Sequence, residues 1–379
     1  MAEMGSSSSS RVGEETLVEA AVRVLNTADP FEKARLGDEV ANKWLLGDIN
    51  IPYDASMDIP VPDRPARLAN MKLVSPSEMP KLGKAGSLQS RQAIVHSLVH
   101  TESWAIDLSW VLVSLFFGLV LIFASGSLPC FVTVRKCCGL LIEQALFAQV
   151  KLLFGKNLVI LILIHISIMS SKDIIARFGM QESMPREFFT DFVKVAQDEG
   201  RHFTLLAARL KEMGSFYGAL PAHDGLWDSA ATTSKDLLAR LAIEHCVHEA
   251  RGLDVLPTTI SRFQKGGDDK TAELLEKVVY PEEITHCAAG VKWFKYICLR
   301  SKIPVMVCDS VVSEEKESEE AETIGIDNMH SEVIQKFHAI VRAFFRGPLK
   351  PPFNEAARRA AGFGPQWYEP LAVKDFPTE

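Results

Sequence analysis

The sequence lacks the cysteine pairs that mark zinc ribbons and redox motifs, since none of its seven cysteines belongs to a Cys-x-x-Cys pair. It also lacks a dense run of lysine and arginine, and at a net charge of −7 it offers no basic stripe to a nucleic-acid backbone. The first residues contain neither the basic nor the apolar segment that opens a secretory signal. We therefore expect a cytoplasmic, reducing environment in which the cysteines are buried thiols.

Composition shifts divide the N-terminal part of the chain. Residues 1–13 are rich in serine and are predicted to be disordered, whereas residues 14–46 carry apolar side chains at helical spacing. Residues 50–84 contain six prolines and few periodic apolar positions, which predicts an extended arm over a surface. We expect this arm to belong to one domain that spans residues 14–375.

Helical periodicity dominates the rest of the chain. The main predicted helices span residues 89–110, 185–214, 234–265 and 268–299. In the first of them Leu98, Glu102 and Ile106 recur every four residues, so a carboxylate lies inside an apolar stripe. Four long helices are the number that a four-helix bundle requires, and the predicted fold class is therefore all-α.

The C-terminal part adds to this bundle. Residues 309–324 are acidic and polar, and are predicted to form a flexible solvated loop. A further helix near residues 329–345 and a proline-rich tail follow.

An apolar insertion interrupts the first predicted helix. Residues 108–134 form an uncharged run of 27, which exceeds the roughly 20 apolar residues needed to cross a bilayer. However, joining Trp110 directly to Asp173 continues the apolar stripe and extends the helix over residues 173–178. Segment 111–172 also begins with valine, whose codons start with GT, and ends with lysine, one of whose codons ends in AG, as a typical intron does. We interpret it as translated intron sequence, with a membrane anchor through residues 108–134 as the alternative.

Two Glu-x-x-His motifs and two single glutamates point to a metal centre. The predicted ligands are Glu102, Glu199, His202, Glu249, Glu283 and His286. Positions three apart lie on one helix face, so each motif directs a carboxylate and an imidazole toward the same point. A bundle site for two metal ions takes such a motif from two helices and one glutamate from each of the other two.

The ligand types indicate which metal to expect. Four carboxylates neutralise two divalent ions, and one imidazole per ion suits iron, with manganese as the alternative. We assign Glu199 and Glu283 as bridging ligands, and Glu102 and Glu249 as terminal ones. Two Glu-x-x-His motifs alone would arise readily by chance. The prediction depends on their place in apolar stripes, where an unpaired carboxylate is costly.

Other polar residues near these positions are weaker candidates. Glu244, His245 and His248 could orient the ligands, but polar residues on a crowded helix are an equally good interpretation. Asp107 and Arg201 are a candidate ion pair outside the ligands. The tryptophans of the helices are better explained by core packing than by an electron path.

Six segments carry a resemblance to a known family. They are HTESWAIDL (100–108), MPREF (184–188), DEGRHF (198–203), HEARGLDV (248–255), EEITH (282–286) and GPLKPPFN (347–354). From about residue 14 to 375, apart from the insertion, the chain resembles the ferritin-like family called domain of unknown function 455. The resemblance implies a ferritin-like di-metal bundle of unassigned activity, distantly similar to tRNA-hydroxylating di-iron monooxygenases. It favours Glu249 over Glu244 as a ligand, and the insertion departs from its pattern.

These observations predict an enzyme, a non-haem di-iron hydroxylase or oxidase that activates oxygen. It would need an electron donor, and the sequence does not identify its substrate. One alternative is a metal-binding protein without turnover, for iron handling or as a structural di-metal core. Another is a membrane-anchored or inactive isoform created by segment 111–172. A substrate-sized cavity beside Glu102 and Glu249 would favour the enzyme.

Overall fold

The protein is described from a computed structural model. The described residues are 15–54, 62, 64–69, 71–80, 83–110, 184–300 and 319–372, with side chains from residue 329 onward in the last range. These residues form helices and no β-strands, which confirms the all-α class. The predicted disordered segment 1–13, the insertion 111–172 and the helix continuation 173–178 lie outside the described residues.

The helices occur in the following order. They are α1 (Leu17–Leu25), α2 (Pro30–Leu46), the 3-10 turn Pro76–Glu78, α3 (Leu88–Trp110), α6 (Arg186–Glu212), α7 (Gly225–Thr232), α8 (Leu237–Ala242), the π-helix Ile243–His248, α9 (Glu249–Lys265), α10 (Asp269–Leu274), the π-helix Leu275–Val279, α11 (Tyr280–Arg300), α12 (Glu319–Phe344), α13 (Glu355–Ala360), α14 (Pro365–Tyr368) and the 3-10 turn Glu369–Leu371. In the described part of the chain, no helix has the length and apolar character that a membrane crossing requires. Most of the predicted span 108–134 falls outside that part.

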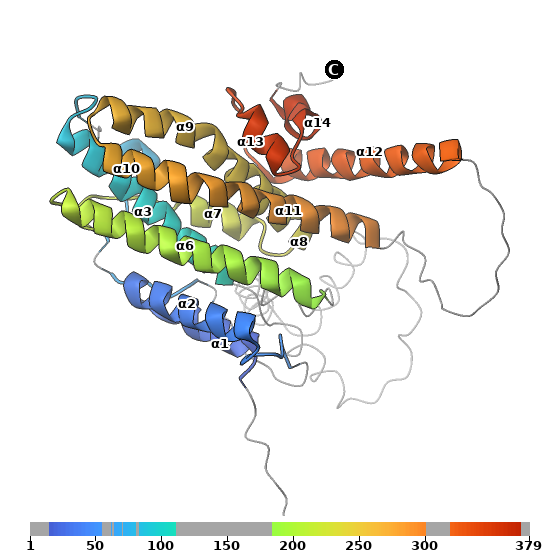
Figure 1. Cartoon of the computed structure of the whole chain (residues 1–379), viewed down its shortest axis with the longest axis horizontal. Coiled ribbons are helices and arrows are strands. Elements are labelled where there is room, and N and C mark those ends of the chain that lie inside the picture. Colours follow the sequence, from blue (N-terminus) through green and yellow to red (C-terminus); the bar gives the residue numbers. More distant parts are fainter. Residues whose placement is uncertain are drawn as a thin grey trace, which may run out of the picture.

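Helices α3, α6, α9 and α11 form the centre of the molecule (Figure 1). α3 packs along α6 and α9 packs along α11, while α11 also contacts α6. α1 and α2 lie on the α6 side, and α12, α13 and α14 lie on the side of α8 and α11 (Figure 1). Most of the buried apolar side chains form one core, and Trp104, Leu108, Trp227 and Ala230 form a second, smaller cluster.

Local sequence signals explain how α1 and α2 arise from the segment predicted to be helical. Thr16 and Glu19 form a capping box at the start of α1. Asp29 caps α2 by accepting hydrogen bonds from the amides of its first turn, and Pro30 occupies the first helical position. α2 ends at Gly47, whose φ of 88° is a left-handed conformation that glycine adopts without strain.

The third and fourth predicted helices contain interruptions that the sequence did not reveal. Each includes one π-helix, Ile243–His248 directly before α9 and Leu275–Val279 directly before α11. π-turns insert extra backbone into a helix and are frequent at functional sites. Both lie within one or two turns of a predicted metal ligand, Glu249 or Glu283, and so they set the rotation at which these carboxylates face the core.

A residue of the C-terminal part replaces a backbone hydrogen bond that is missing from α9. Pro257 has no amide hydrogen, so the carbonyl of Leu253 lacks its helical partner. The side-chain amide of Asn354 donates to this carbonyl at 3.0 Å, and α9 continues to Lys265. The segments around residues 248–255 and 347–354, both part of the family resemblance, are therefore in direct contact.

The helix predicted at residues 329–345 is present as α12 and begins earlier, at Glu319. The backbone at residues 319–324, assigned to the acidic loop by the sequence, belongs to this helix, and residues 309–318 lie outside the described part.

Candidate metal centre

The structure brings the six predicted ligands into one cluster between the central helices. Its members are Glu102 on α3, Glu199 and His202 on α6, Glu249 at the start of α9, and Glu283 and His286 on α11. They form two overlapping groups, one with Glu102 and His202 and the other with Glu249 and His286. Glu199 and Glu283 belong to both groups, and in each group the potential ligand atoms lie within 4.8 Å of one another.

Unsatisfied polar atoms inside the cluster fit a metal ion. Five of the six side chains are buried, and Glu249 is partly exposed. Nδ1 of His202, Nδ1 of His286 and Oε2 of Glu199 are buried without a hydrogen-bond partner among the described residues. Buried polar atoms are normally paired, and these three all lie at the cluster. Among the described residues, the charged neighbours that act on the four carboxylates are the two histidines and the other glutamates rather than a lysine or arginine, which suits a site for cations.

Without metal, the cluster retains protons. Burial raises the pKa of Glu102 well above its usual range, and the neighbouring Glu199 raises it further. Burial also raises the pKa of Glu249 and of Glu283. Burial alone would lower the pKa of His202 and His286, but the surrounding carboxylates outweigh it and raise both. Metal binding must therefore displace protons from these groups.

Glu199 behaves differently from the other three glutamates. Burial acts to raise its pKa, but the positive charge of His286 and the nearby imidazole of His202 lower it well below its usual value. It is the carboxylate most readily ionised in the cluster, and it belongs to both ligand groups.

An outer layer of charged residues holds the two histidines. Nε2 of His202 lies 2.7 Å from Glu282, and Nε2 of His286 lies 3.3 Å from Asp198. Each pair joins α6 to α11. Arg201 donates to both carboxylates, at 2.7 Å to Asp198 and 2.6 Å to Glu282. Because Nε2 of each histidine contacts a carboxylate, its Nδ1 faces the cluster. A second ring nitrogen held in this way fixes the orientation and tautomer of an imidazole that binds a metal.

The suggested ion pair between Asp107 and Arg201 was wrong. Asp107 is fully buried and accepts hydrogen bonds from Lys33 and Arg67. Arg201 instead binds Asp198 and Glu282, as described above. Asp198 and Glu282 directly precede the glutamates of the two Glu-x-x-His motifs, a signal in the sequence that was not used.

The residues near Glu249 do not form a similar layer. Glu244 accepts a hydrogen bond from Ser229, which also lies 3.0 Å from His248. His245 packs edge-on against Phe192, and burial lowers its pKa to about 3. The tryptophans Trp104, Trp110 and Trp293 are buried, as core packing predicts.

A cavity of about 340 Å3 opens beside the cluster. Four of the six cluster residues line it: Glu102, Glu199, Glu249 and Glu283. Much of the remaining lining is apolar and includes Leu98, Ala105, Leu108, Val255 and Leu256. The two histidines do not line it, so it approaches the cluster from the side opposite the Arg201 layer.

These features define an all-helical protein with a buried glutamate and histidine cluster that is able to hold a metal ion. A profile for the family described as "Protein of unknown function (DUF455)" matches residues 26–130 and 159–369, and the chain belongs to this family. The unmatched residues 131–158 lie within the predicted insertion.

One relative is an uncharacterized protein of Haemophilus influenzae, 33% identical over 121 residues. The match covers 32% of this chain and 42% of that protein, so it spans less than half of the relative's length. No solved structure matches the chain.

Proposed function

We propose that the central helices form a ferritin-like bundle that holds two iron ions, with manganese as the alternative metal. Glu199 and Glu283 would bridge the ions, because they are the two residues common to both ligand groups. Glu102 and His202 would complete one site, and Glu249 and His286 the other. The overlap of the two groups is the observation that carries this proposal.

We further propose that the protein is an oxygen-activating hydroxylase or oxidase. Iron held by carboxylates and imidazoles supplies redox chemistry and open positions for oxygen. The chain's own residues would position the metals, exclude bulk water and admit a substrate. Support comes from the cavity of about 340 Å3, which meets Glu102 and Glu249 and has the mainly apolar lining of a small-molecule site. A protein that only stores iron or uses it structurally does not need such access.

Metal content tests the first part. Elemental mass spectrometry of the purified protein should find about two iron or manganese ions per chain, as the paired ligand set requires. The double variant Glu199→Ala with Glu283→Ala should lose them. Glu273→Ala with Glu276→Ala is the matched control, because it removes two glutamates that are exposed and lie shortly before Glu283 in the chain. Folded protein without bound metal, or a double variant that keeps its metal, would refute the site.

Oxygen consumption tests the second part. The iron-loaded protein, supplied with a chemical reductant, should consume oxygen repeatedly and in excess of its own iron. Consumption that stops after the bound iron is oxidised once would favour iron handling over an oxidase.

A further inference from the structure

A second, larger cavity lies on the other face of α3. Its volume is about 590 Å3, and its α3 wall consists of His100, Ser103 and Trp104. At about 100° per residue, these positions point away from Glu102 on the same helix. The two cavities share no lining residue. An occupant of this cavity would therefore be separate from the metal centre.

The other walls come from distant parts of the sequence. The proline-rich arm contributes Arg64, Arg67 and the apolar side chains that follow them, and the start of α2 contributes Asp29, Phe31 and Lys33. The arm is fixed at both ends of this wall. The amide of Ala66 donates to the carbonyl of Leu25. On either side of Leu73, the amide of Val74 donates to Ala222 and the amide of Ala222 donates to Lys72. The described part of the arm thus covers a preformed space, although little of it is helical.

Hydrogen-bond donors exceed acceptors on the polar side of the cavity. Asp107 lies behind this wall, and Lys33 and Arg67 occupy its two oxygens. Arg67 also donates to the hydroxyl and carbonyl of Ser103. These contacts use three of the five N–H groups of a guanidinium, and the lysine ammonium, which also binds Ala66, keeps a third donor.

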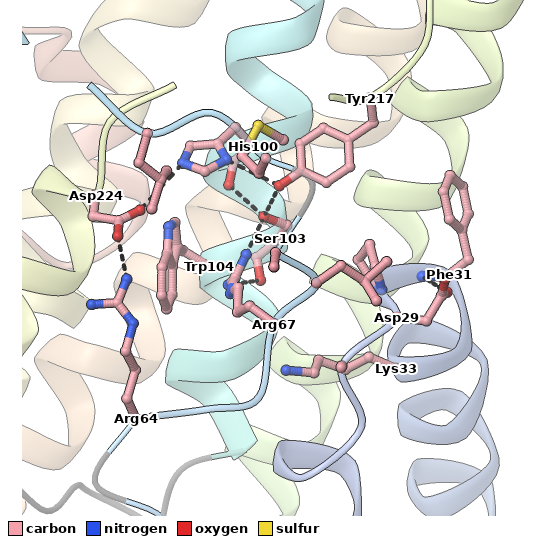
Figure 2. Close-up of a pocket in the computed structure, with 16 residues that line it drawn as sticks. Asp29, Phe31, Lys33, Arg64, Arg67, His100, Ser103, Trp104, Tyr217 and Asp224 are labelled. Atoms are coloured by element: carbon pink, nitrogen blue, oxygen red, sulfur yellow. Dashed lines mark hydrogen bonds and ion pairs between the residues drawn. The ribbon is translucent and has the colours of Figure 1, made fainter. Parts of the chain in front are cut away.

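The histidine and the two aspartates that also line the cavity do not balance this excess of hydrogen-bond donors. Burial lowers the pKa of His100 to about 4, so it adds no charge at neutral pH. Asp224 binds Arg64, and Asp29 is engaged by the amides that begin α2. Figure 2 shows a chain of hydrogen bonds from Arg67 to Ser103 and from Ser103 to Tyr217, with Lys33 on the far side of Arg67. This side of the cavity is suited to a ligand group that accepts several hydrogen bonds.

Three large apolar side chains lie among the exposed residues that line the cavity. Phe31, Leu68 and Leu73 line it and are 51%, 42% and 48% exposed. Large apolar side chains exposed together around a hollow are characteristic of a binding site. The cavity therefore combines a donor-rich interior with exposed apolar side chains, beside which Asp29 and Arg64 are engaged by other groups.

We propose that this cavity binds an organic carboxylic acid, with the carboxylate on Arg67 and Lys33 and an apolar body against Phe31, Leu68 and Leu73. Guanidinium and ammonium groups bind carboxylates by charge-assisted hydrogen bonds, which are the strongest that a protein offers to such a ligand. The bound acid would connect the arm to α3. This inference is independent of the metal centre and of the activity proposed above.

Calorimetric titration of the full-length protein tests the proposal. The probes are monocarboxylates from acetate to dodecanoate, each compared with the alcohol of equal length. An acid of intermediate or long chain should bind, while its alcohol and acetate should bind about tenfold or more weakly, because they lack either the charge or the apolar body. Equal binding of acid and alcohol, or no binding by any acid, would overturn the proposal.

Variants locate the bound acid. Arg67→Gln should weaken acid binding by about tenfold or more. Arg35→Gln is the matched control, since Arg35 is an exposed arginine on α2 that pairs with Glu32 and Glu39 outside the cavity. Ala69→Trp should block the cavity without touching an ion pair, and it covers the case in which Arg67→Gln does not fold. Glu199→Ala should leave binding unchanged. Binding that is lost in Glu199→Ala and kept in Arg67→Gln would place the acid at the metal centre and refute the second site.

Discussion

Glu282 on α11 holds His202 on α6 through a 2.7 Å contact, although the two residues are 80 positions apart in the chain. The reciprocal contact joins Asp198 on α6 to His286 on α11. Each Glu-x-x-His helix therefore orients the histidine of the other, and Arg201 connects the two contacts. The two halves of the cluster are positioned as a unit.

The first prediction concerns this outer layer. Glu282→Ala should lower the affinity for the metal by about 10- to 100-fold, because His202 would lose the partner that fixes its ring and its tautomer. Competition with a chelator of known affinity measures the change. Glu273 is a glutamate with a side chain 63% exposed that pairs with Lys277, and Glu273→Ala should leave the affinity unchanged. An unchanged affinity in Glu282→Ala would mean that His202 needs no outer partner.

The second prediction concerns pH. In the metal-free protein, the pKa values of Glu102, Glu249, His202 and His286 are raised. Such groups stabilise the fold fully below their unfolded pKa values, about 4.3 for glutamate and 6.5 for histidine, and lose that contribution as pH rises through the folded values. The melting temperature of metal-free protein should therefore fall as the pH rises above about 6.

Glu199 acts in the opposite direction, since its lowered pKa stabilises the fold at neutral pH and loses that effect in acid. The double variant Glu102→Gln with Glu249→Gln should flatten the decline at higher pH, because these two groups would no longer titrate. Metal addition in weak buffer should release protons and acidify the solution. A metal-free protein whose melting temperature rises between neutral and alkaline pH would contradict the proposed protonation.

The third prediction concerns the packing of α11 on the π-helix before α9. A Cβ on Gly290 would lie 2.0 Å from the carbonyl oxygen of His245, whereas a Cβ on Gly200 would come no closer than 3.6 Å to any atom outside its own turn. Gly290→Ala should destabilise the protein by about 1–3 kcal/mol or more through overpacking. Gly200→Ala should be neutral or stabilising by up to about 1 kcal/mol, because alanine favours the helix. Chemical denaturation of both variants measures the contrast, and equal effects would show that the close approach is relaxed in solution.

The fourth prediction compares two adjacent arginines. Arg358 makes a two-pronged bond to Asp254 at 2.8 and 2.6 Å, and both side chains are almost completely buried. Arg359 pairs with Glu355 on the surface. Arg358→Ala should cost about 3–5 kcal/mol, since the buried Asp254 would lose its two-pronged partner and keep the amide of Asn354 and a longer contact with Arg251. Arg359→Ala should cost no more than about 1 kcal/mol. Chemical denaturation of the two variants measures the difference in stability. A loss for Arg358→Ala as small as that for Arg359→Ala would mean that water reaches Asp254.

The arrangement of the cluster was accessible from the sequence because its signals are local. A glutamate and a histidine three positions apart share a helix face, and a lone glutamate such as Glu102 is conspicuous within an apolar stripe. The side chains predicted in this way lie together in the structure. Whether they bind metal, and which one, stays a prediction.

Features that depend on packing between distant segments were not accessible. The π-turn before Glu249 adds a residue to a helix without changing its composition, so counting apolar positions does not detect it. Asp107 was assigned to the wrong partner because Lys33 and Arg67 are 74 and 40 residues away in the chain, and helical periodicity does not show which distant segments pack together. The cavity beneath the arm likewise depends on where Arg64 to Leu73 settle, which local propensity does not determine.

The fifth prediction concerns segment 111–172. α3 is described up to Trp110, which is buried against α2 near Gly37, so the helix reaches the core at the point where the insertion begins. Deleting residues 111–172 would join Trp110 to Asp173 and extend the apolar stripe over residues 173–178. The deletion variant should therefore melt at a higher temperature than the full chain and should bind at least as much metal per chain.

A deletion of equal length cannot be made elsewhere without removing a described helix. The control therefore changes how Trp110 is connected to Asp173. A variant that deletes 111–172 and replaces it with a flexible glycine and serine linker should keep the cluster but lose the gain in melting temperature, because the stripe would not continue as one helix. A deletion variant that unfolds or loses its metal would show that the segment supports the fold. It would also contradict an intron origin, as would transcripts that never join the codons of Trp110 and Asp173.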